Sequence, residues 1–250
     1  MTALEKNRVL IEEMLSLYIE KLFWDNEHKR KFLNYLKTNY NCFIFGGIIV
    51  DFLLKRTNHR DVDIVIDNFD NDLIDYIECL KGSKNSFGGY KVVIDNLIID
   101  IWPIEKTWAF KRNNTLNFFL PMLLPMTSFF NATSIIFSLS EQKLYWTEGF
   151  SKFLTEKKVD IVFEENPYPE LCIVKTIDYI RNKYEISPNL KKYIRHFFGV
   201  KYQLLESIQI KHYGYIKYSL NEIITILQSL EDNNKSPKTE KEEELQYTLF

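Results

Sequence analysis

The sequence predicts an α+β fold in which a mixed β-sheet domain is followed by a helical region. Short runs rich in Val, Ile and aromatic residues alternate with helical periodicity up to about residue 165. From Pro169 onward only the helical period continues. With 250 residues and a hydrophobic fraction of 46%, the chain can bury one large core or two small ones.

The predicted elements alternate from the start of the chain. Apolar residues at helical spacing predict a first helix: Leu4, Ile11, Met14, Leu15, Tyr18 and Leu22. A second helix is expected over residues 27–36. Strands are expected at residues 42–45, 62–66, 90–94 and 97–102, with helices at 48–54 and 71–80 between them. Residues 81–89 (KGSKNSFGG) have loop composition.

The second half of the chain is predicted to be helical at residues 175–183, 189–208 and 215–230. Residues 231–250 are highly charged until the last five, which favours a flexible tail. We therefore expect three parts: a head at 1–165, a helical domain at 166–230 and a tail at 231–250.

Composition restricts the function. A net charge of −2 gives no global field for capturing nucleic acid. The cysteines Cys42, Cys79 and Cys172 are far apart and odd in number, which argues against a disulfide scaffold or a zinc site. Residues 113–140 carry no charge, but they contain prolines and lack an apolar run of about 20 residues. We expect a soluble, cytoplasmic protein.

Two carboxylates stand out on the second predicted strand. Asp61 and Asp63 are two residues apart, so they project from the same side of the strand, whereas Val62 and Ile64 face the other way. Two such carboxylates repel each other and are costly to bury unless a cation lies between them. A third acid, Asp100, lies on another apolar strand. Three acids on neighbouring strands can hold two metal ions for phosphoryl transfer.

A glycine pair precedes these acids. Gly46 and Gly47 lie at a predicted strand-to-helix turn, where backbone N–H groups can hold phosphates. Alone, an Asp-x-Asp strand is more typical of a solvated edge, and a Gly-Gly pair of an ordinary turn. Here the two glycines, thirteen intervening residues, Asp61-Val62-Asp63 and a later strand Asp occur in order, which favours the catalytic interpretation.

At these residues the sequence resembles the polymerase-β-like nucleotidyltransferase superfamily. More narrowly, it resembles the head of bacterial tRNA CCA-adding enzymes and poly(A) polymerases, whose pattern is GGxVRDxLLGR followed by DxD. Residues 46–56 (GGIIVDFLLKR) and 61–63 match this pattern. Phe130-Asn131-Ala132 resembles the family's TINA segment, residues 141–154 its closing hairpin and helix, and residues 169–188 its first neck helix.

The resemblance implies specific roles for several residues. It implies that two Mg²⁺ ions, for which Mn²⁺ can substitute, are bound by Asp61, Asp63 and Asp100, which are also the catalytic residues. It implies nucleotide contacts from the following residues: Gly46, Gly47, Arg60, Asn131 and Lys175. The activity implied is transfer of a nucleotide from a nucleoside triphosphate, with release of pyrophosphate.

The departures from the family pattern argue against CCA addition. Val50 replaces the arginine of the glycine motif, and residues 126–129 (MTSF) replace the paired arginines before TINA. The base-reading EDxxR motif is missing near residues 168–172 (YPELC), where only Lys175 approaches the position of a neck arginine. After about residue 190 we expect too little chain for a body that grips tRNA.

A different acceptor must then supply the attacking hydroxyl. Tyr247 lies in QYTLF after a charged stretch of fifteen residues, which spans about 50 Å when extended, against a radius of gyration of about 18 Å for a domain of this size. Tyr247 can therefore reach an active site and prime synthesis if Asp100 or a metal accepts its proton.

A tail of this kind resembles that of the Hailong-type anti-phage nucleotidyltransferases, which use a C-terminal tyrosine as primer. That resemblance implies dATP as substrate, a short deoxyadenosine oligomer as product and a membrane effector protein regulated by it.

Two alternatives remain open. The chain can be a nucleotidyltransferase that modifies a tRNA or a partner protein, as toxin–antitoxin enzymes do, or an inactive nucleotide-binding module. Intact acids at all three positions weigh against the inactive module. The QYTLF end can also be an apolar plug that docks on a groove or on a second subunit of a homo-oligomer. The sequence leaves the sugar, the base, the acceptor and the product length undetermined.

Overall fold

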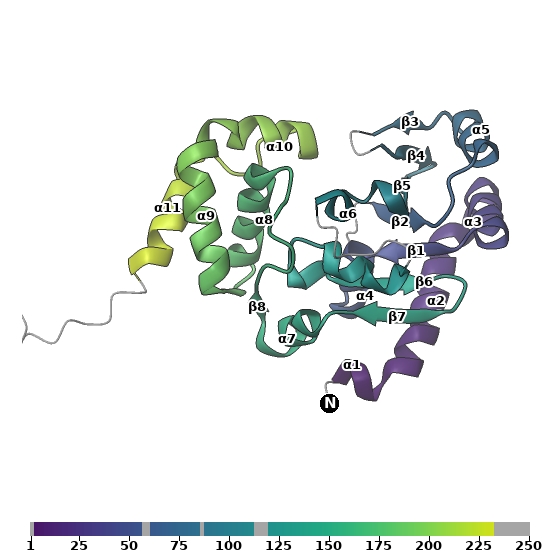
Figure 1. The fold of residues 1–250 in the computed structure, drawn as a ribbon, viewed down its shortest axis with the longest axis horizontal. Coiled ribbons are helices and arrows are strands. Elements are labelled where there is room, and N and C mark those ends of the chain that lie inside the picture. The colour runs from purple at the N-terminus through teal and green to yellow at the C-terminus, as the bar shows by residue number, and fades with distance from the viewer. Residues whose placement is uncertain (1–2, 57–60, 86–87, 113–119, 233–250) are drawn as a thin grey trace, which may run out of the picture. The chain divides into compact units, whose positions relative to one another are not determined.

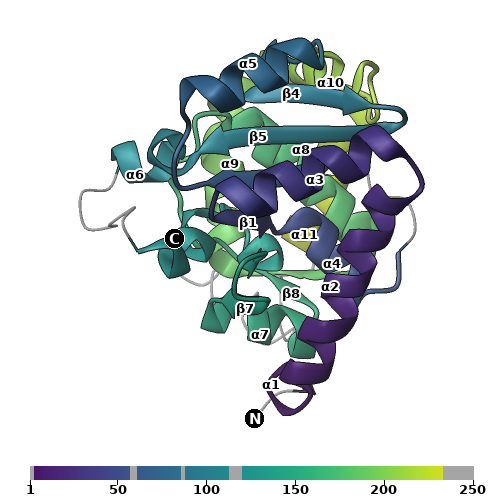
Figure 2. The ribbon, with the colours of Figure 1, turned by 90° about the vertical axis from the view of Figure 1, so that its right-hand side faces the viewer.

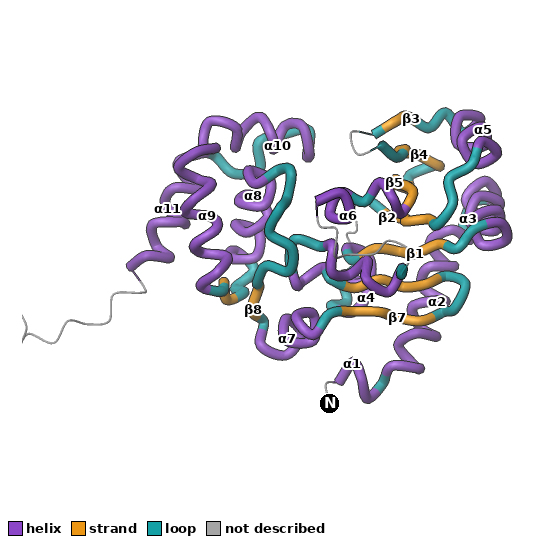
Figure 3. Tube along the Cα trace, viewed as in Figure 1, coloured by secondary structure: helices purple, strands orange, loops and turns teal. Residues whose placement is uncertain are grey.

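The computed structural model describes residues 3–56, 61–85, 88–112 and 120–232. The chain divides into two compact units, residues 1–167 and residues 168–250. A seven-stranded sheet lies in the first unit, and the described part of the second is almost entirely helix (Figure 3). The predicted α+β fold class is confirmed, and the division into three functional parts stays a prediction.

The sheet of the first unit is mixed. Its order is β3-β4-β5-β2-β1-β6-β7 (Figure 1). The strands are β1 (Cys42–Phe45), β2 (Val62–Ile66), β3 (Ser83–Lys84), β4 (Tyr90–Ile94), β5 (Leu97–Pro103), β6 (Ile135–Ser138) and β7 (Lys143–Trp146). β2 and β5 are parallel, and every other neighbouring pair is antiparallel. Strands distant in sequence are thereby brought together at β2 and β5.

Helices flank this sheet. They are α1 (Ala3–Lys6), α2 (Arg8–Trp24), α3 (Glu27–Asn39), α4 (Gly47–Leu53), α5 (Asn71–Cys79), α6 (Trp108–Arg112) and α7 (Glu148–Glu156). The 3₁₀ turns are η1 (Ile104–Lys106), η2 (Pro121–Thr127) and η3 (Asn131–Thr133), and a short strand, β8 (Lys158–Val159), follows α7. Helices α2, α3 and α5 lie on one side of the sheet (Figure 2).

Side-chain caps define where two of these helices begin. The Asn26 side chain accepts hydrogen bonds from the backbone N–H groups of His28 and Lys29 at the start of α3. Asp70 accepts one from the Leu73 N–H at the start of α5. Both satisfy donors that a helix leaves unpaired in its first turn.

Apolar residues cover the sheet on both faces. On the helix side, Ile44, Ile64 and Ile101 lie in register across β1, β2 and β5 and are fully buried. On the other side a second cluster joins the sheet to η1, α6 and η2: Phe43, Val65, Ile104, Phe110, Leu124 and Ile136. Burial on both faces explains why these strands consist of nearly continuous apolar runs.

The second unit is a small helical assembly. It contains α8 (Pro169–Arg181), β9 (Glu185–Ile186), α9 (Pro188–Lys201), η4 (Tyr202–Leu204), α10 (Leu205–Tyr213) and α11 (Leu220–Asp232). Asp178 of α8 accepts hydrogen bonds of 2.5 Å from both Lys217 and Tyr218, which fixes the segment leading into α11. Among the described residues, no helix combines the length and apolar character needed to cross a bilayer.

Three local expectations were wrong. Met14 was expected to belong to the apolar stripe of the first helix, but it is exposed, and Leu15, Ile19 and Phe23 face the core. The single helix expected over residues 189–208 breaks at η4, and the loop expected at 81–89 contains β3. Each error concerns a choice that tertiary packing makes among locally similar alternatives.

Candidate active site

Two of the predicted acids face each other across neighbouring strands. In the parallel β2–β5 pair, Asp63 lies opposite Asp100, so the two backbones are about 4.8 Å apart at this point. Both residues are half-buried. Their side chains share the face of Val65, because residues two apart in a strand point the same way. Two parts of the chain about 37 residues apart thus converge on one site.

Asp61 lies near this pair, just before the start of β2. It is half-buried. The alternation of β2 continues to it, since Val62 and Ile64 are fully buried against the helices. Val62 and Ile64 therefore face the helices, whereas Asp61, Asp63 and Asp100 are directed to the other face of the sheet.

Sequence reasoning missed a lysine in this row. Lys91 lies opposite Asp100 in the antiparallel β4–β5 pair, and its Nζ is 2.6 Å from Oδ2 of Asp100. The side chains are 40% and 17% exposed, so water reaches the pair. A signal was present in the sequence: a hairpin that turns at Asp95-Asn96 sets this register.

The acids fit a hard divalent cation in part. Carboxylate oxygens are the ligands that Mg²⁺ prefers, and Asp61 and Asp63 offer them from one face. Asp100 is paired with Lys91. Across the described ranges no three His, Cys, Asp or Glu side chains are grouped as a metal site. Asp100 must exchange Lys91 for the metal if it is to be a ligand.

The two glycines differ in what the fold demands of them. Extending the antiparallel β1–β2 register brings the turn after β1 beside the start of β2. A Cβ on Gly46 would lie 2.4 Å from the Thr133 carbonyl oxygen, so packing against η3 excludes a side chain there. A Cβ on Gly47 would meet nothing within 4 Å. The chain thus leaves open space at Gly47, next to the acids.

Comparison with known proteins supports this architecture. No protein-family model matches the chain, and no curated protein matches it. Solved structures do. A CCA-adding enzyme in complex with CTP has a TM-score of 0.57 at 16% identity, over 81% of this chain and 52% of that chain. The Thermotoga maritima CCA-adding enzyme complexed with tRNA has a TM-score of 0.53 at 18% identity, over 80% and 51%.

A tRNA nucleotidyltransferase complexed with a primer tRNA and an incoming ATP analogue is also similar, with a TM-score of 0.54, 15% identity, and coverage of 82% of this chain and 63% of that chain. The fold of this chain is therefore similar to that of the matched part of these enzymes. The chain spans about half the length of the CCA-adding enzymes it matches.

Asn131 has a structural part in the first unit. Its side chain is buried and donates hydrogen bonds to the carbonyls of Gly149 (3.2 Å) and Lys158 (3.1 Å). Its Oδ1 accepts from the Asp160 N–H at 2.9 Å. Backbone groups thus occupy its amide, and its contact with a nucleotide stays a prediction. The side chain fixes η3, which packs against Gly46.

The remaining predicted site residues lie elsewhere. Lys175 belongs to α8 of the second unit and is half-buried, so its contact with a nucleotide stays a prediction. Arg60 and Tyr247 lie outside the described residues.

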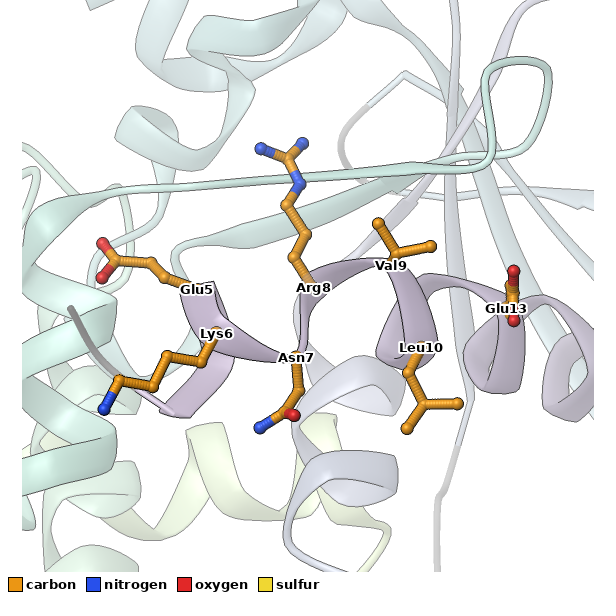
Figure 4. A pocket seen from close by; sticks show the side chains of 7 residues that line it. All are labelled: Glu5, Lys6, Asn7, Arg8, Val9, Leu10 and Glu13. Carbon is orange, nitrogen blue, oxygen red and sulfur yellow. The ribbon is translucent and has the colours of Figure 1, made fainter.

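A hollow of about 380 Å³ at the junction of α1 and α2 is separate from these residues. Figure 4 shows Arg8 pointing away from Asn7 and Leu10 around the helix. The guanidinium of Arg8 donates to Glu12 and to the Leu144 carbonyl, both at 2.7 Å. This hollow contains none of the predicted site residues, and its arginine serves to attach α2 to β7.

Proposed function

We propose that the chain is a metal-dependent, template-independent nucleotidyltransferase. The supporting observation is the pairing of Asp63 with Asp100 on adjacent parallel strands, with Asp61 on the same face and the Gly46-Gly47 turn beside them. These residues occur in a nucleotidyltransferase head fold.

The proposed reaction uses these residues as follows. A hydroxyl oxygen bonds to the α-phosphorus of a nucleoside triphosphate, the bond to the β-phosphate oxygen breaks, and pyrophosphate leaves. Bound Mg²⁺ or Mn²⁺ would neutralise charge on the phosphates. Asp61 and Asp63 would hold the cation, and the backbone at Gly47 has room for the phosphates. Asp100 lies where a carboxylate can accept the hydroxyl proton.

We further propose that the product is a short oligonucleotide primed by Tyr247, with dATP as the first substrate to test. The support is the resemblance of the head and of the tyrosine-bearing tail to the Hailong-type defence enzymes. An anti-phage role, a membrane effector regulated by the product and a homo-oligomeric state belong to the same proposal. A cytoplasmic location is proposed from the cysteine pattern.

A second candidate is transfer of a nucleotide to a tRNA or a protein. The observation that favours it is that similar solved structures are tRNA enzymes complexed with tRNA. The departures from the CCA-adding pattern at Val50, at residues 126–129 and at residues 168–172 weigh against it.

One assay separates these candidates. The purified protein is incubated with Mg²⁺ and each ribo- or deoxynucleoside triphosphate, and products are followed by denaturing gel and intact-protein mass. Priming predicts that the protein gains mass in steps of one nucleotide before free oligomers appear. Tyr247→Phe keeps the ring and removes the hydroxyl, so it should abolish that gain. Thr248 is the nearest other hydroxyl, and Thr248→Val is the matched control.

If Tyr247→Phe makes product at the parent rate with no mass added to the parent protein, self-priming is wrong. The assay then continues with tRNA or a candidate partner protein as acceptor. Absence of any transfer with all triphosphates, and with Mn²⁺ in place of Mg²⁺, would support the inactive nucleotide-binding module.

A further inference from the structure

A groove lies between α9 and α11 of the second unit and has a volume of about 320 Å³. Its cations are Lys191 and Arg195 of α9. Its apolar lining is Ile194, Phe198, Ile224, Leu227 and Leu230. No acidic residue lines it among the residues up to Leu230, where the described side chains of this helix end. The groove therefore combines an apolar floor with a positively charged side.

The helical period explains the groove. Along α9, the residues that line it recur three and four apart, so they form one strip of that helix. At Gly199 this strip carries no side chain, and a Cβ there would meet nothing within 4 Å. The glycine leaves the groove open instead of filled by its own helix.

Residues 233–250 match this surface in chemistry. They lie outside the described residues, and their sequence places Glu240, Glu242, Glu243 and Glu244 directly before an apolar end. That end carries Leu245, Tyr247, Leu249 and Phe250. We propose that this segment docks in the α9–α11 groove of its own chain, with its acids beside Lys191 and Arg195 and one or two apolar side chains inside.

The connection is long enough for this. Helix α11 ends at Asp232, and its groove residues extend back to Ile224, about 12 Å along the helix axis. The eight residues 233–240 span up to about 27 Å. The volume lies at the low end for ligand pockets, which suits one or two side chains and not a whole helix.

A nucleic acid is a poorer match. A single strand bound at this groove would use the two cations for its phosphates, but it also requires aromatic faces on which bases stack. Phe198 is the one aromatic residue of the lining, and the neighbouring Tyr193 is 3% exposed. Aliphatic walls favour a peptide.

Docking has a consequence for priming. If Tyr247 is the acceptor, a docked segment keeps its hydroxyl in the groove, so release precedes the first transfer. This consequence rests on the proposed function, whereas docking itself does not.

The test is photo-cross-linking in the full chain, with p-benzoylphenylalanine in place of Phe250. We expect cross-links within one chain to peptides of α9 and α11, identified by mass spectrometry. Arg195→Glu should lower their yield about fivefold or more, because it replaces attraction by repulsion. Lys192→Glu makes the same charge change on an exposed residue of α9 outside the groove and should have little effect.

Filling the groove gives an independent check. Gly199→Leu places a side chain in the open space and should abolish the cross-links, whereas Val200→Leu on the exposed neighbour should not. Circular dichroism of each variant shows whether the fold is kept.

Each other result overturns the proposal. Cross-links that map outside α9 and α11, or none, exclude docking here. Cross-links only between chains of different isotope label identify a second copy as the source of the segment. Arg195-dependent binding of single-stranded oligodeoxyadenylate without cross-links assigns the groove to nucleic acid.

The cross-linking is repeated with Asp63→Asn, a variant of the proposed metal site. An unchanged yield of cross-links in this variant shows that docking does not depend on the proposed catalytic activity.

Discussion

Three charged side chains cross the sheet in one row: Lys91, Asp100 and Asp63. The row follows from two independent strand pairings. The parallel β2–β5 pair places Asp63 opposite Asp100, and the antiparallel β4–β5 pair places Lys91 opposite Asp100. In the proposed site Asp61 and Asp63 hold the metal ion. Lys91 forms an ion pair with Asp100 in the metal-free protein. The chemistry of the site is therefore decided by single side chains.

Asp61→Ala or Asp63→Ala is expected to lower nucleotide transfer about a hundredfold or more, because each removes a proposed metal ligand. The melting temperature without metal should stay level or rise, since repulsion between the carboxylates is relieved. Gel assays and thermal unfolding measure these two quantities. Asp75→Ala, at an exposed acid of α5, is the matched control, and turnover near the parent rate in either variant contradicts the metal site.

Lys91→Met is expected to strengthen Mn²⁺ binding to the nucleotide-free protein about two- to fivefold, because it removes the cation that competes for Asp100. Stability should change by less than about 1 kcal/mol, since water screens this pair. Titration calorimetry measures the affinity. Asp100→Asn should weaken binding instead, and Lys84→Met should leave it unchanged. Equal affinity in Lys91→Met and the parent protein would show that Lys91 does not compete with the metal.

The turn from β1 to α4 is the element that joins the site to its frame. Gly46 packs against Thr133 of η3, and η3 is in turn fixed by the amide of Asn131. Gly47 has no such neighbour. One glycine thus serves packing, and the other leaves room beside the acids.

Gly46→Ala is expected to lower the free energy of unfolding by about 1–3 kcal/mol, because its methyl group overlaps the Thr133 carbonyl. The melting temperature should fall by several degrees. Gly47→Ala should leave stability within about 0.5 kcal/mol but raise the KM for the triphosphate if phosphates approach this backbone. Chemical denaturation and initial rates separate the two effects. Equal destabilisation by both variants would show that the turn is organised differently.

At the scale of the whole molecule, two cysteines are sealed in the cores of different units. Cys42 lies in β1 and Cys172 in α8, and both are buried, whereas Cys79 is exposed. Burial raises the pKa of the Cys42 thiol to about 12 and that of the Cys172 thiol, also mainly through burial, to about 12. Both thiols therefore report on the integrity of the fold.

Stability is expected to fall above pH 9. Below that pH these thiols are protonated in both states. Above it the unfolded chain loses protons that the folded chain keeps, at roughly 1.4 kcal/mol per thiol and pH unit up to about pH 12. Burial and a hydrogen bond with Tyr35 also raise the pKa of Tyr40. Ionisation of this tyrosine in the unfolded chain therefore lowers stability further above pH 10.

Denaturant titrations at pH 8, 9 and 10 measure this loss. At pH 8 a thiol reagent should modify Cys79 quickly and the other two only after unfolding. Unchanged stability at pH 10, or rapid reaction of all three thiols in the native protein, would contradict the burial of Cys42 and Cys172.

The sequence by itself determined the local elements and the nature of the site. Strands β1, β2 and β4 begin and end where their short runs rich in Val, Ile and aromatic residues predict. The α+β class followed from the alternation of such runs with helical periodicity, which stops at about residue 165. The acids Asp61 and Asp63 share a side because a strand has a period of two, a property of the backbone alone.

Tertiary structure decided which distant residues meet. Asp63 faces Asp100 only because β2 and β5 are parallel neighbours, and strand order is not encoded in local periodicity. The antiparallel pairing of β4 and β5 brought Lys91 to Asp100, and hydrogen bonds to the backbone at residues 149, 158 and 160 made Asn131 a packing residue. Met14 and Leu15 have similar apolar character, and tertiary packing selected Leu15 for burial. Local sequence sets the direction of each side chain along its own element, and long-range packing, which depends on the whole chain, sets its partner.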